Sequence, residues 1–167
     1  AFASEDADVR LNELGTMMKS SGATGKRKIL IVEDNEMNLK MLDALLADKY
    51  EVLTAKNGRI GLNILEEKYK ELSLVLLDVH MPVLNGFEFL KRVREDALLS
   101  SVPIMVITAN GGIDVELNCL DLGAADFITK PYHSDIIIRR IRNVIRLKES
   151  SLTLEAVERD ELTGLYT

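Results

Sequence analysis

The chain has 167 residues, of which 47% are hydrophobic and 29% charged, and its formal net charge is −6. This composition is that of a globular protein, because a disordered chain would be poorer in Leu, Ile and Val. The negative charge gives no support to a nucleic-acid or anionic-membrane partner, and no apolar run approaches the roughly 20 residues of a membrane span. The single cysteine, Cys119, excludes an internal disulfide and fits a reducing, cytoplasmic compartment.

The first residues stand apart from the rest. Val9, Leu11, Leu14 and Met18 would line one side of a short helix. The stretch KSSGATGKRK that follows is typical of a flexible linker with a basic cluster. We therefore expect residues 1–27 to form a helical or flexible N-terminal tail.

From residue 28, short apolar runs alternate with amphipathic stretches of helix length. The expected strands are KILIVED, EVLTA, LVLLD, VPIMVITA and DFITK. The expected helices span residues 36–48, 58–70, 86–97, 112–122 and 133–149. Unbroken apolar strands that alternate with helices are typical of a parallel sheet covered on both faces. The sequence therefore predicts a doubly wound α/β domain over residues 28–148.

The last expected helix is apolar over more of its circumference than one core-facing side needs. Its apolar residues are Ile136, Ile137, Ile138, Ile141, Val144 and Ile145. No strong helix breaker follows before Gly164, so we expect this helix to leave the domain as a linker over residues 149–167.

Polar residues follow four of the five expected strands. Strand one ends in Glu33 and Asp34, strand three in Asp78, strand four in Thr108 and strand five in Lys130. Ligands of parallel α/β sheets collect at the carboxyl ends of the strands. Three carboxylates, a hydroxyl and an amine should therefore meet at one rim of the sheet.

This set of side chains suits phosphoryl transfer. Three crowded carboxylates repel one another, and a hard divalent cation such as Mg²⁺ would relieve the repulsion. A carboxylate beside such a metal can attack phosphorus and form an aspartyl phosphate, with Lys130 and Thr108 stabilising the phosphoryl oxygens. Taken singly, Asp78 is more often a helix cap or turn former, Lys130 a solvated amine and Thr108 a backbone-bonded hydroxyl. Their shared position after different strands favours the site.

The segments ILIVEDNEMNL, LVLLDVHMPVLNGFEFL, PIMVITA and LGAADFITKPY resemble the receiver domain of two-component response regulators. The resemblance keeps order and spacing over about residues 28–148. It implies a flavodoxin-like fold with five helices and five parallel strands in the order 2-1-3-4-5. It also implies a phosphorylation-dependent switch that takes its phosphoryl group from a histidine kinase or phosphotransfer protein, with Mg²⁺.

The resemblance also carries roles over to single residues. Asp78 matches the phosphoacceptor, and Asp34 and Glu33 match the acidic pair that holds Mg²⁺, Asp34 directly and Glu33 through water. The backbone carbonyl of His80 matches the third metal ligand from the protein. Thr108 matches the switch hydroxyl that moves onto the phosphoryl group.

Further matches lie after the third and fifth strands. Lys130 matches the lysine of the phosphoryl site, and its bond to Pro131 is cis in the family. Phe127 matches the switch aromatic, which turns inward when the hydroxyl moves. Pro82 and Gly86 match the residues that shape the loop after the phosphoacceptor.

Some positions depart from the family pattern or vary within it. His80 and Asn110 stand where the family tunes the lifetime of the phosphoryl group, although an exposed side chain that contributes only its carbonyl explains His80 equally well. Glu33 stands where many relatives carry Asp, which is a mild departure. Cys119 is expected on the fourth helix, packed or half-exposed, without a redox role.

The tail RDELTGLYT resembles the opening of a GGDEF-type diguanylate cyclase domain, in which such a segment follows a helical linker. The matching residues are Asp160, Leu162, Thr163, Gly164 and Leu165. The resemblance implies an attached output domain that makes cyclic di-GMP, or a degenerate one. The catalytic part is absent, so this chain is not expected to be an enzyme itself. A capped turn that ends a helix at Gly164 is the ordinary alternative.

Other functions stay open at this point. An aspartyl-nucleophile phosphatase commonly carries a second Asp two residues after the nucleophile, where this chain has His80. A receiver of a hybrid kinase or phosphorelay, and a binding module with a vestigial site, would act through protein contacts. In the switch interpretation, two copies could pair through the face formed by the fourth helix, fifth strand and fifth helix.

Overall fold

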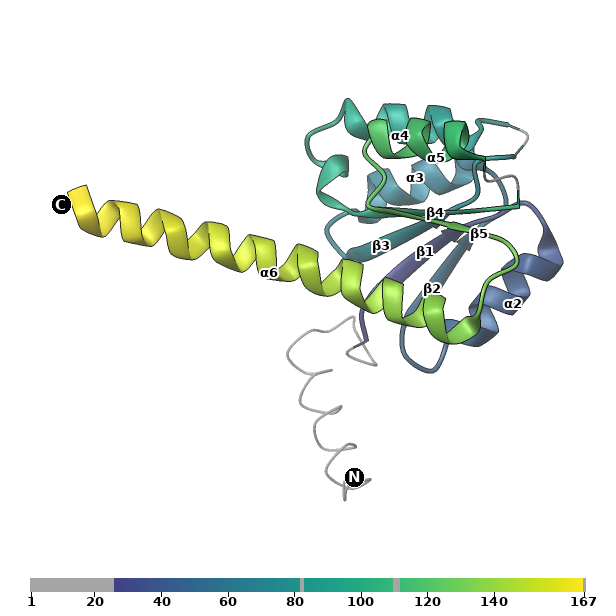
Figure 1. Cartoon of the computed structure of the whole chain (residues 1–167), viewed down its shortest axis with the longest axis horizontal. Coiled ribbons are helices and arrows are strands. Elements are labelled where there is room, and N and C mark those ends of the chain that lie inside the picture. The colour runs from purple at the N-terminus through teal and green to yellow at the C-terminus, as the bar shows by residue number, and fades with distance from the viewer. Residues whose placement is uncertain (1–25, 82, 110–111, 167) are drawn as a thin grey trace, which may run out of the picture.

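A computed structural model shows a five-stranded parallel sheet with helices on both faces (Figure 1). The structure describes residues 26–81, 83–109 and 112–166, with side chains as far as residue 151. The elements are β1 (Lys28–Val32), α2 (Glu36–Leu46), β2 (Glu51–Ala55), α3 (Gly58–Lys68), β3 (Leu72–Leu77), α4 (Gly86–Arg94), the 3-10 turn η1 (Leu99–Ser101), β4 (Ile104–Thr108), α5 (Ile113–Asp121), β5 (Asp126–Thr129) and α6 (Ser134–Tyr166). The strand order is β2-β1-β3-β4-β5, which confirms the expected flavodoxin-like topology.

Three of the sequence-based expectations fall outside the described residues. They concern the N-terminal tail over residues 1–25, Pro82 and Asn110. In the described part of the chain, no helix has both the length and the apolar character needed to cross a bilayer.

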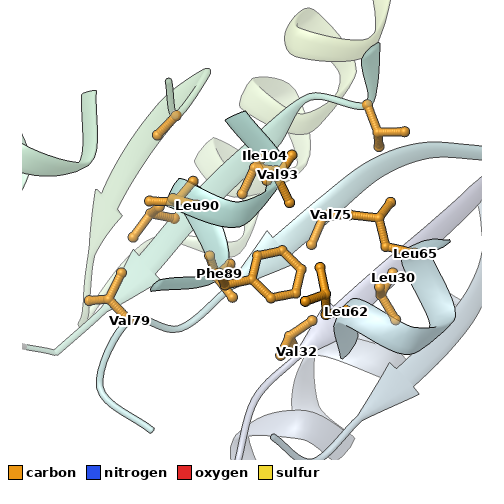
Figure 2. Packing of buried hydrophobic residues seen from close by; sticks show 14 of the residues in the cluster. Leu30, Val32, Leu62, Leu65, Val75, Val79, Phe89, Leu90, Val93 and Ile104 are labelled. Atoms are coloured by element: carbon orange, nitrogen blue, oxygen red, sulfur yellow. The ribbon is translucent and has the colours of Figure 1, made fainter. Parts of the chain in front are cut away.

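The core lies in two layers, one on each face of the sheet. Along β1, Leu30 and Val32 point into the layer under α3, α4 and α5, whereas Ile29 and Ile31 point into the layer under α2 and α6. Phe89 of α4 is fully buried in the first layer, among side chains of β1, β3 and α3 (Figure 2). Burial on both faces explains why the strands read as unbroken apolar runs.

The strands end earlier than the apolar runs suggested. β1 ends at Val32 rather than at Asp34, and β5 ends at Thr129 rather than at Lys130. β3 starts earlier than expected, at Leu72, and its register with β1 shifts between Lys28 and Ile29. A bulge of this kind leaves no mark in the apolar pattern, so the sequence could not reveal it.

The helices also differ from the expected ranges at their C-terminal ends. α4 ends at Arg94 rather than at residue 97, because the Asp96 carboxylate accepts from the backbone N–H groups of Leu98 and Leu99 and starts the η1 turn. α2, α3 and α5 each end one or two residues before the expected position. Such fraying is ordinary for helix ends and moves no site residue.

α6 is the longest element, and it leaves the body of the domain (Figure 1). Ile137, Ile141 and Ile145 are buried against the sheet, whereas Ile136 is 47% exposed. The helix thus carries more apolar surface than the core uses, and it continues beyond the domain to Tyr166, as the sequence led us to expect. The expected linker helix is confirmed, and the helix does not stop at Gly164.

The loop between β3 and α4 depends on a close approach at Gly86. A Cβ at this position would lie 2.3 Å from the Cα of Val79 and 2.9 Å from the carbonyl oxygen of Asp78. The left-handed residues of the same loop are Val83 (φ 50°) and Leu84 (φ 61°). Gly86 is therefore needed for space rather than for a left-handed backbone, which Val83 and Leu84 adopt despite their side chains.

We predict that Gly86→Ala destabilises the domain by about 1–3 kcal/mol, because the new methyl group overlaps the backbone of the preceding loop. Thermal unfolding followed by circular dichroism should show a melting temperature lower by several degrees. Gly112→Ala is the matched control, since a Cβ there meets nothing within 4 Å. Equal melting temperatures for the two variants would contradict the close-packing argument.

Candidate functional site

Three carboxylates meet at the C-terminal end of the sheet. Glu33 and Asp34 follow β1, and Asp78 follows β3, which lies beside β1 in the sheet. One oxygen from each carboxylate lies within 4.8 Å of the others. Glu33 is 2% exposed and Asp78 9% exposed, whereas Asp34 faces solvent. The sequence-based expectation that folding gathers these residues agrees with this geometry.

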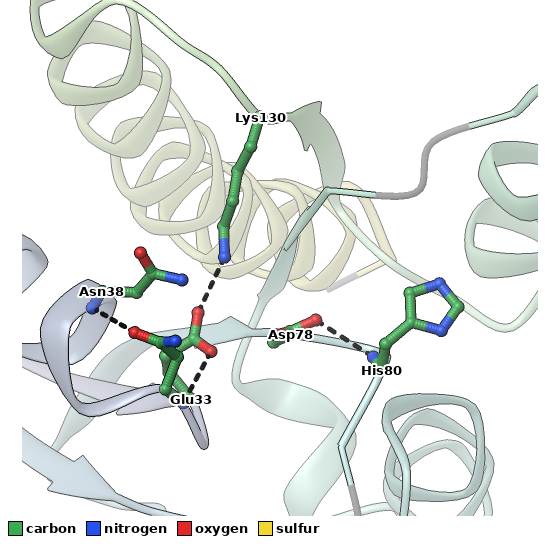
Figure 3. A network of polar contacts seen from close by, with 6 residues as sticks. Glu33, Asn38, Asp78, His80 and Lys130 are labelled. Atoms are coloured by element: carbon green, nitrogen blue, oxygen red, sulfur yellow. Dashed lines mark hydrogen bonds and ion pairs between the residues drawn. The ribbon is translucent and has the colours of Figure 1, made fainter.

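The amine of Lys130 lies within the same group. Lys130 follows β5, and its Nζ lies 3.0 Å from Oε1 of Glu33 (Figure 3). Its backbone N–H donates to the carbonyl of Thr108. The Lys130–Pro131 peptide bond is cis, as the family resemblance implies. In this state of the molecule the amine neutralises Glu33.

The electrostatics of the site oppose full ionisation. Burial raises the pKa of Glu33, the hydrogen bond from Lys130 lowers it, and the nearby charge of Asp78 raises it again, so that the net direction is upward. The pKa of Asp34 is also raised, first by partial loss of water and then by Glu33. A bound cation would reverse these penalties, since oxygen donors of this kind suit a hard divalent metal such as Mg²⁺.

Both the backbone and the side chain of Asp78 form hydrogen bonds. Its backbone N–H donates to the carbonyl of Val32, 3.0 Å away, which ties it to the end of β1. Its Oδ1 accepts from the backbone N–H of His80, also at 3.0 Å (Figure 3). The hydrogen bond from His80 thus orients the Asp78 carboxylate through Oδ1 and leaves Oδ2 out of that contact.

The side chain of His80 points away from the carboxylates (Figure 3). It is exposed, and its ring meets the ring of Phe87 edge-on, with centroids 6.3 Å apart. The backbone of His80 therefore serves the site directly, whereas its imidazole packs on the first turn of α4.

Thr108 and Phe127 occupy neighbouring strands, β4 and β5. Thr108 is fully buried at the last position of β4, and Phe127 is 6% exposed and packs in the layer that also holds Phe89. Both side chains are inside the protein rather than at its surface. Cys119, on α5, is fully buried as well, and burial raises the pKa of its thiol to about 11, which leaves it inert at neutral pH.

A cavity of about 550 Å³ opens beside Lys130, between α2 and the start of α6. Its lining is mainly apolar and comprises Asn38, Met41, Ala44, Leu45, Lys130, Pro131, Tyr132 and Ser134. Asn38 is held in the first turn of α2 because its backbone N–H donates to the Asn35 side chain, which caps the helix. Sequence reasoning overlooked Asn38 and this cavity. The cap residue Asn35 could have been recognised, because Asn immediately before a helix is a typical cap. That signal marks the start of α2 and does not reveal the cavity.

Comparison with known proteins identifies the family. The family model of the response regulator receiver domain matches residues 29–142. The chain belongs to this family. Because the match covers the sheet and the acidic cluster together, the fold and the site point to the same class of protein.

Several individual proteins are similar to the chain. It is 33% identical over 138 residues to response regulator PleD of Caulobacter vibrioides and 44% identical over 127 residues to transcriptional regulatory protein DltR of Streptococcus agalactiae. These matches cover 82% and 75% of the chain but 29% and 54% of the relatives. The chain thus spans about half or less of the length of these curated relatives.

A solved structure adds information about a metal. The receiver domain of sensor histidine kinase PA1611 from Pseudomonas aeruginosa, at 29% identity and a TM-score of 0.66, matches 72% of the chain and 98% of its own length. That structure has a magnesium ion coordinated in the active site cleft.

We predict that Lys130→Met destabilises the protein by about 1–3 kcal/mol at neutral pH, because it leaves the buried Glu33 carboxylate without its cation. Without Lys130 the pKa of Glu33 rises further above its ordinary value of 4.5. The folded state then holds a proton that the unfolded state has lost, so stability falls as the pH rises through that interval.

Melting temperatures from about pH 5 to pH 8, in EDTA, measure this effect. The deficit of Lys130→Met relative to wild type should grow with pH. Lys40→Met is the control, since Lys40 forms an exposed pair with Glu36 at 3.9 Å, and its deficit should be small and flat. A deficit for Lys130→Met that does not change with pH would contradict the role given to Glu33.

Proposed function

We propose that this chain is a phosphorylation-dependent switch in which Asp78 accepts a phosphoryl group from a histidine kinase or a phosphotransfer protein. The observation that carries the proposal is the meeting of three carboxylates and one amine at the end of a rigid parallel sheet. The four side chains lie at the C-terminal ends of the strands, where doubly wound folds bind their ligands.

The proposed metal is Mg²⁺. Asp34 and Asp78 would hold it directly with the backbone carbonyl of His80, and Glu33 through water. When bound, it would neutralise the carboxylates and the phosphoryl oxygens. Asp34 suits direct ligation because it is exposed, whereas Glu33 is buried and already paired with Lys130.

The proposed reaction is a displacement at phosphorus. A carboxylate oxygen of Asp78 forms the new P–O bond, the P–N bond to the donor imidazole breaks, and the imidazole leaves with its electron pair and takes up a proton. The hydrogen bond from the His80 backbone holds the carboxylate oriented for this attack. Pro82 and Gly86 would keep the loop clear of the approaching donor.

Phosphorylation would then shift the balance between two conformers. Lys130 would move from Glu33 to the new phosphoryl group, and the hydroxyl of Thr108 would donate to it. Phe127, on the neighbouring strand, would fill the space that Thr108 vacates. His80 and Asn110 stand at the positions where the family tunes the lifetime of the phosphoryl group, and that role is proposed for them here.

We propose domain limits of 28–148 for the receiver and 149–167 for the linker, in a cytoplasmic protein. The Asp160–Leu165 segment supports a GGDEF-type output domain after the linker, making cyclic di-GMP or a degenerate relative of such a domain. The alternative is the receiver of a hybrid kinase, the setting of the PA1611 domain. The domain composition of the full-length protein would decide between the two.

The proposed partner in the activated state is a second copy, docked through α5, β5 and α6. Ile113, Leu117 and Leu120 form an exposed apolar stripe on α5, at 68%, 52% and 41% exposure. Their spacing of four and three residues places them on one side of the helix. Ile136 adds exposed apolar surface on α6.

We predict that acetyl phosphate with Mg²⁺ labels the wild-type chain and that Asp78→Asn abolishes the label, because the amide is not a nucleophile toward phosphorus. Removal of Mg²⁺ with EDTA should have the same effect on the wild type. Asp48→Asn, which alters an exposed carboxylate after α2, should label normally. Phosphate-affinity gel electrophoresis measures all of these.

Equal labelling of Asp78→Asn and wild type would refute the assignment of the phosphoacceptor. Sustained turnover of a small phosphoester would instead favour the phosphatase interpretation. Failure of Mg²⁺ to bind at millimolar concentration would favour a binding module with a vestigial site.

We predict that Leu117→Glu prevents pairing of the activated chain, since a charge at the centre of the stripe would be buried in the interface. Analytical ultracentrifugation with beryllium fluoride and Mg²⁺ should show dimers for wild type and monomers for the variant. Leu98→Glu is the control, because Leu98 is similarly exposed, at 59%, but lies between α4 and η1. If Leu117→Glu still dimerises like wild type, another face mediates pairing.

A further inference from the structure

The point at which α6 leaves the domain carries an ion pair of specific geometry. Arg27 Nε lies 2.7 Å from Oε2 of Glu149, and Arg27 Nη2 lies 2.9 Å from Oε1. Both oxygens of the carboxylate thus meet two nitrogens of the guanidinium, which is the strongest arrangement of this pair. The pair raises the pKa of Arg27 and lowers the pKa of Glu149.

Glu149 stands at a boundary along α6. Ile145 is the last buried apolar side chain that the structure describes on this helix, at 4% exposure, and Leu147 is already 70% exposed. Glu149 lies one turn beyond Ile145, so Arg27 holds the helix where apolar packing has ended.

Packing on another side of this turn is loose. A cavity of about 340 Å³ is bordered by Ile145, Lys148 and Glu149 of α6, and across from them by residues 69, 70, 72 and 73 and by residues 101–103. Because a cavity offers few dispersion contacts, the turn depends more than the rest of α6 on polar contacts.

Arg27 is itself anchored to the sheet. Its carbonyl accepts from the backbone N–H of Glu51, the residue that pairs with Lys28 at the start of the β1–β2 ladder. The neighbouring Lys26 donates from Nζ to the carbonyl of Ala47 at the end of α2. The guanidinium therefore extends from a backbone that β2 and α2 hold in place.

We propose that Arg27 and Glu149 form a latch that fixes the direction in which the linker helix leaves the domain. The helix continues to Tyr166, roughly 25 Å beyond Glu149 at 1.5 Å per residue, so a tilt of about 10° at the latch would displace that end by about 4 Å. The latch also joins the chain that precedes β1 to the linker.

The latch is tested by hydrogen exchange of the backbone amides of residues 147–153 in the 167-residue chain, measured by mass spectrometry without phosphoryl donor. Arg27→Gln and Glu149→Gln should each raise exchange about two- to five-fold, the range for losing an exposed but bidentate pair. The charge swap Arg27→Glu with Glu149→Arg should recover a large part of the protection. The effect should shrink at 1 M salt, where the Debye length is about 3 Å.

Arg140→Gln is the matched control. Arg140 lies on the same helix and pairs with Asp126 through a single 3.4 Å contact, so its loss should leave exchange at residues 147–153 unchanged. Circular dichroism would verify that each variant is folded. Wild-type exchange in both single variants, or a charge swap no better than they are, would overturn the latch. Phosphorylation is absent from the assay, so the result is independent of the proposed function of Asp78.

Discussion

The candidate site depends on three carboxylates that the sheet holds together at one rim, although they repel one another. Glu33, Asp34 and Asp78 offer oxygens within 4.8 Å of one another, and burial alone already raises the pKa of Glu33. Such a cluster is unfavourable in the absence of positive charge, and the fold tolerates it because β1 and β3 are buried on both faces and cannot relax. The same repulsion therefore lowers the stability of the domain and raises its affinity for a cation.

Lys130 supplies the compensation that the metal-free protein needs. Its amine pairs with Glu33, the most buried of the acids, rather than with Asp78. In the proposed switch, this pair belongs to the unphosphorylated state. A phosphoryl group on Asp78 would present more negative charge than Glu33 does, and Lys130 would exchange one partner for the other. The differential affinity of one amine for two anions is the kind of contact that can shift a two-state equilibrium.

Much of the fold and site followed from the sequence because both rest on local patterns. Apolar runs of strand length indicated the sheet, and the polar residues after four of the five runs indicated the rim, so Glu33, Asp78 and Lys130 were found together. The bulge near Lys28, the left-handed Val83 and Leu84, and the exact partner of Lys130 were not predictable. Register, loop strain and choice of ion partner depend on contacts between distant segments, which no local pattern records.

The pair of Arg27 and Glu149 could not be predicted from the sequence either, because it joins distant segments. It also bears on how the long last helix is held. The two residues are separated by 122 positions, and each one alone reads as a solvated charge. α6 starts four residues after Lys130, at the acidic rim, and reaches the latch near the opposite end of the sheet. Ile137 and Ile141 pack the first turns of α6 against the strands, so we expect this part of the helix to shift only as a unit. If a rearrangement at Lys130 displaced α6, the exposed ion pair at its exit could break and re-form, whereas apolar packing there would oppose the displacement.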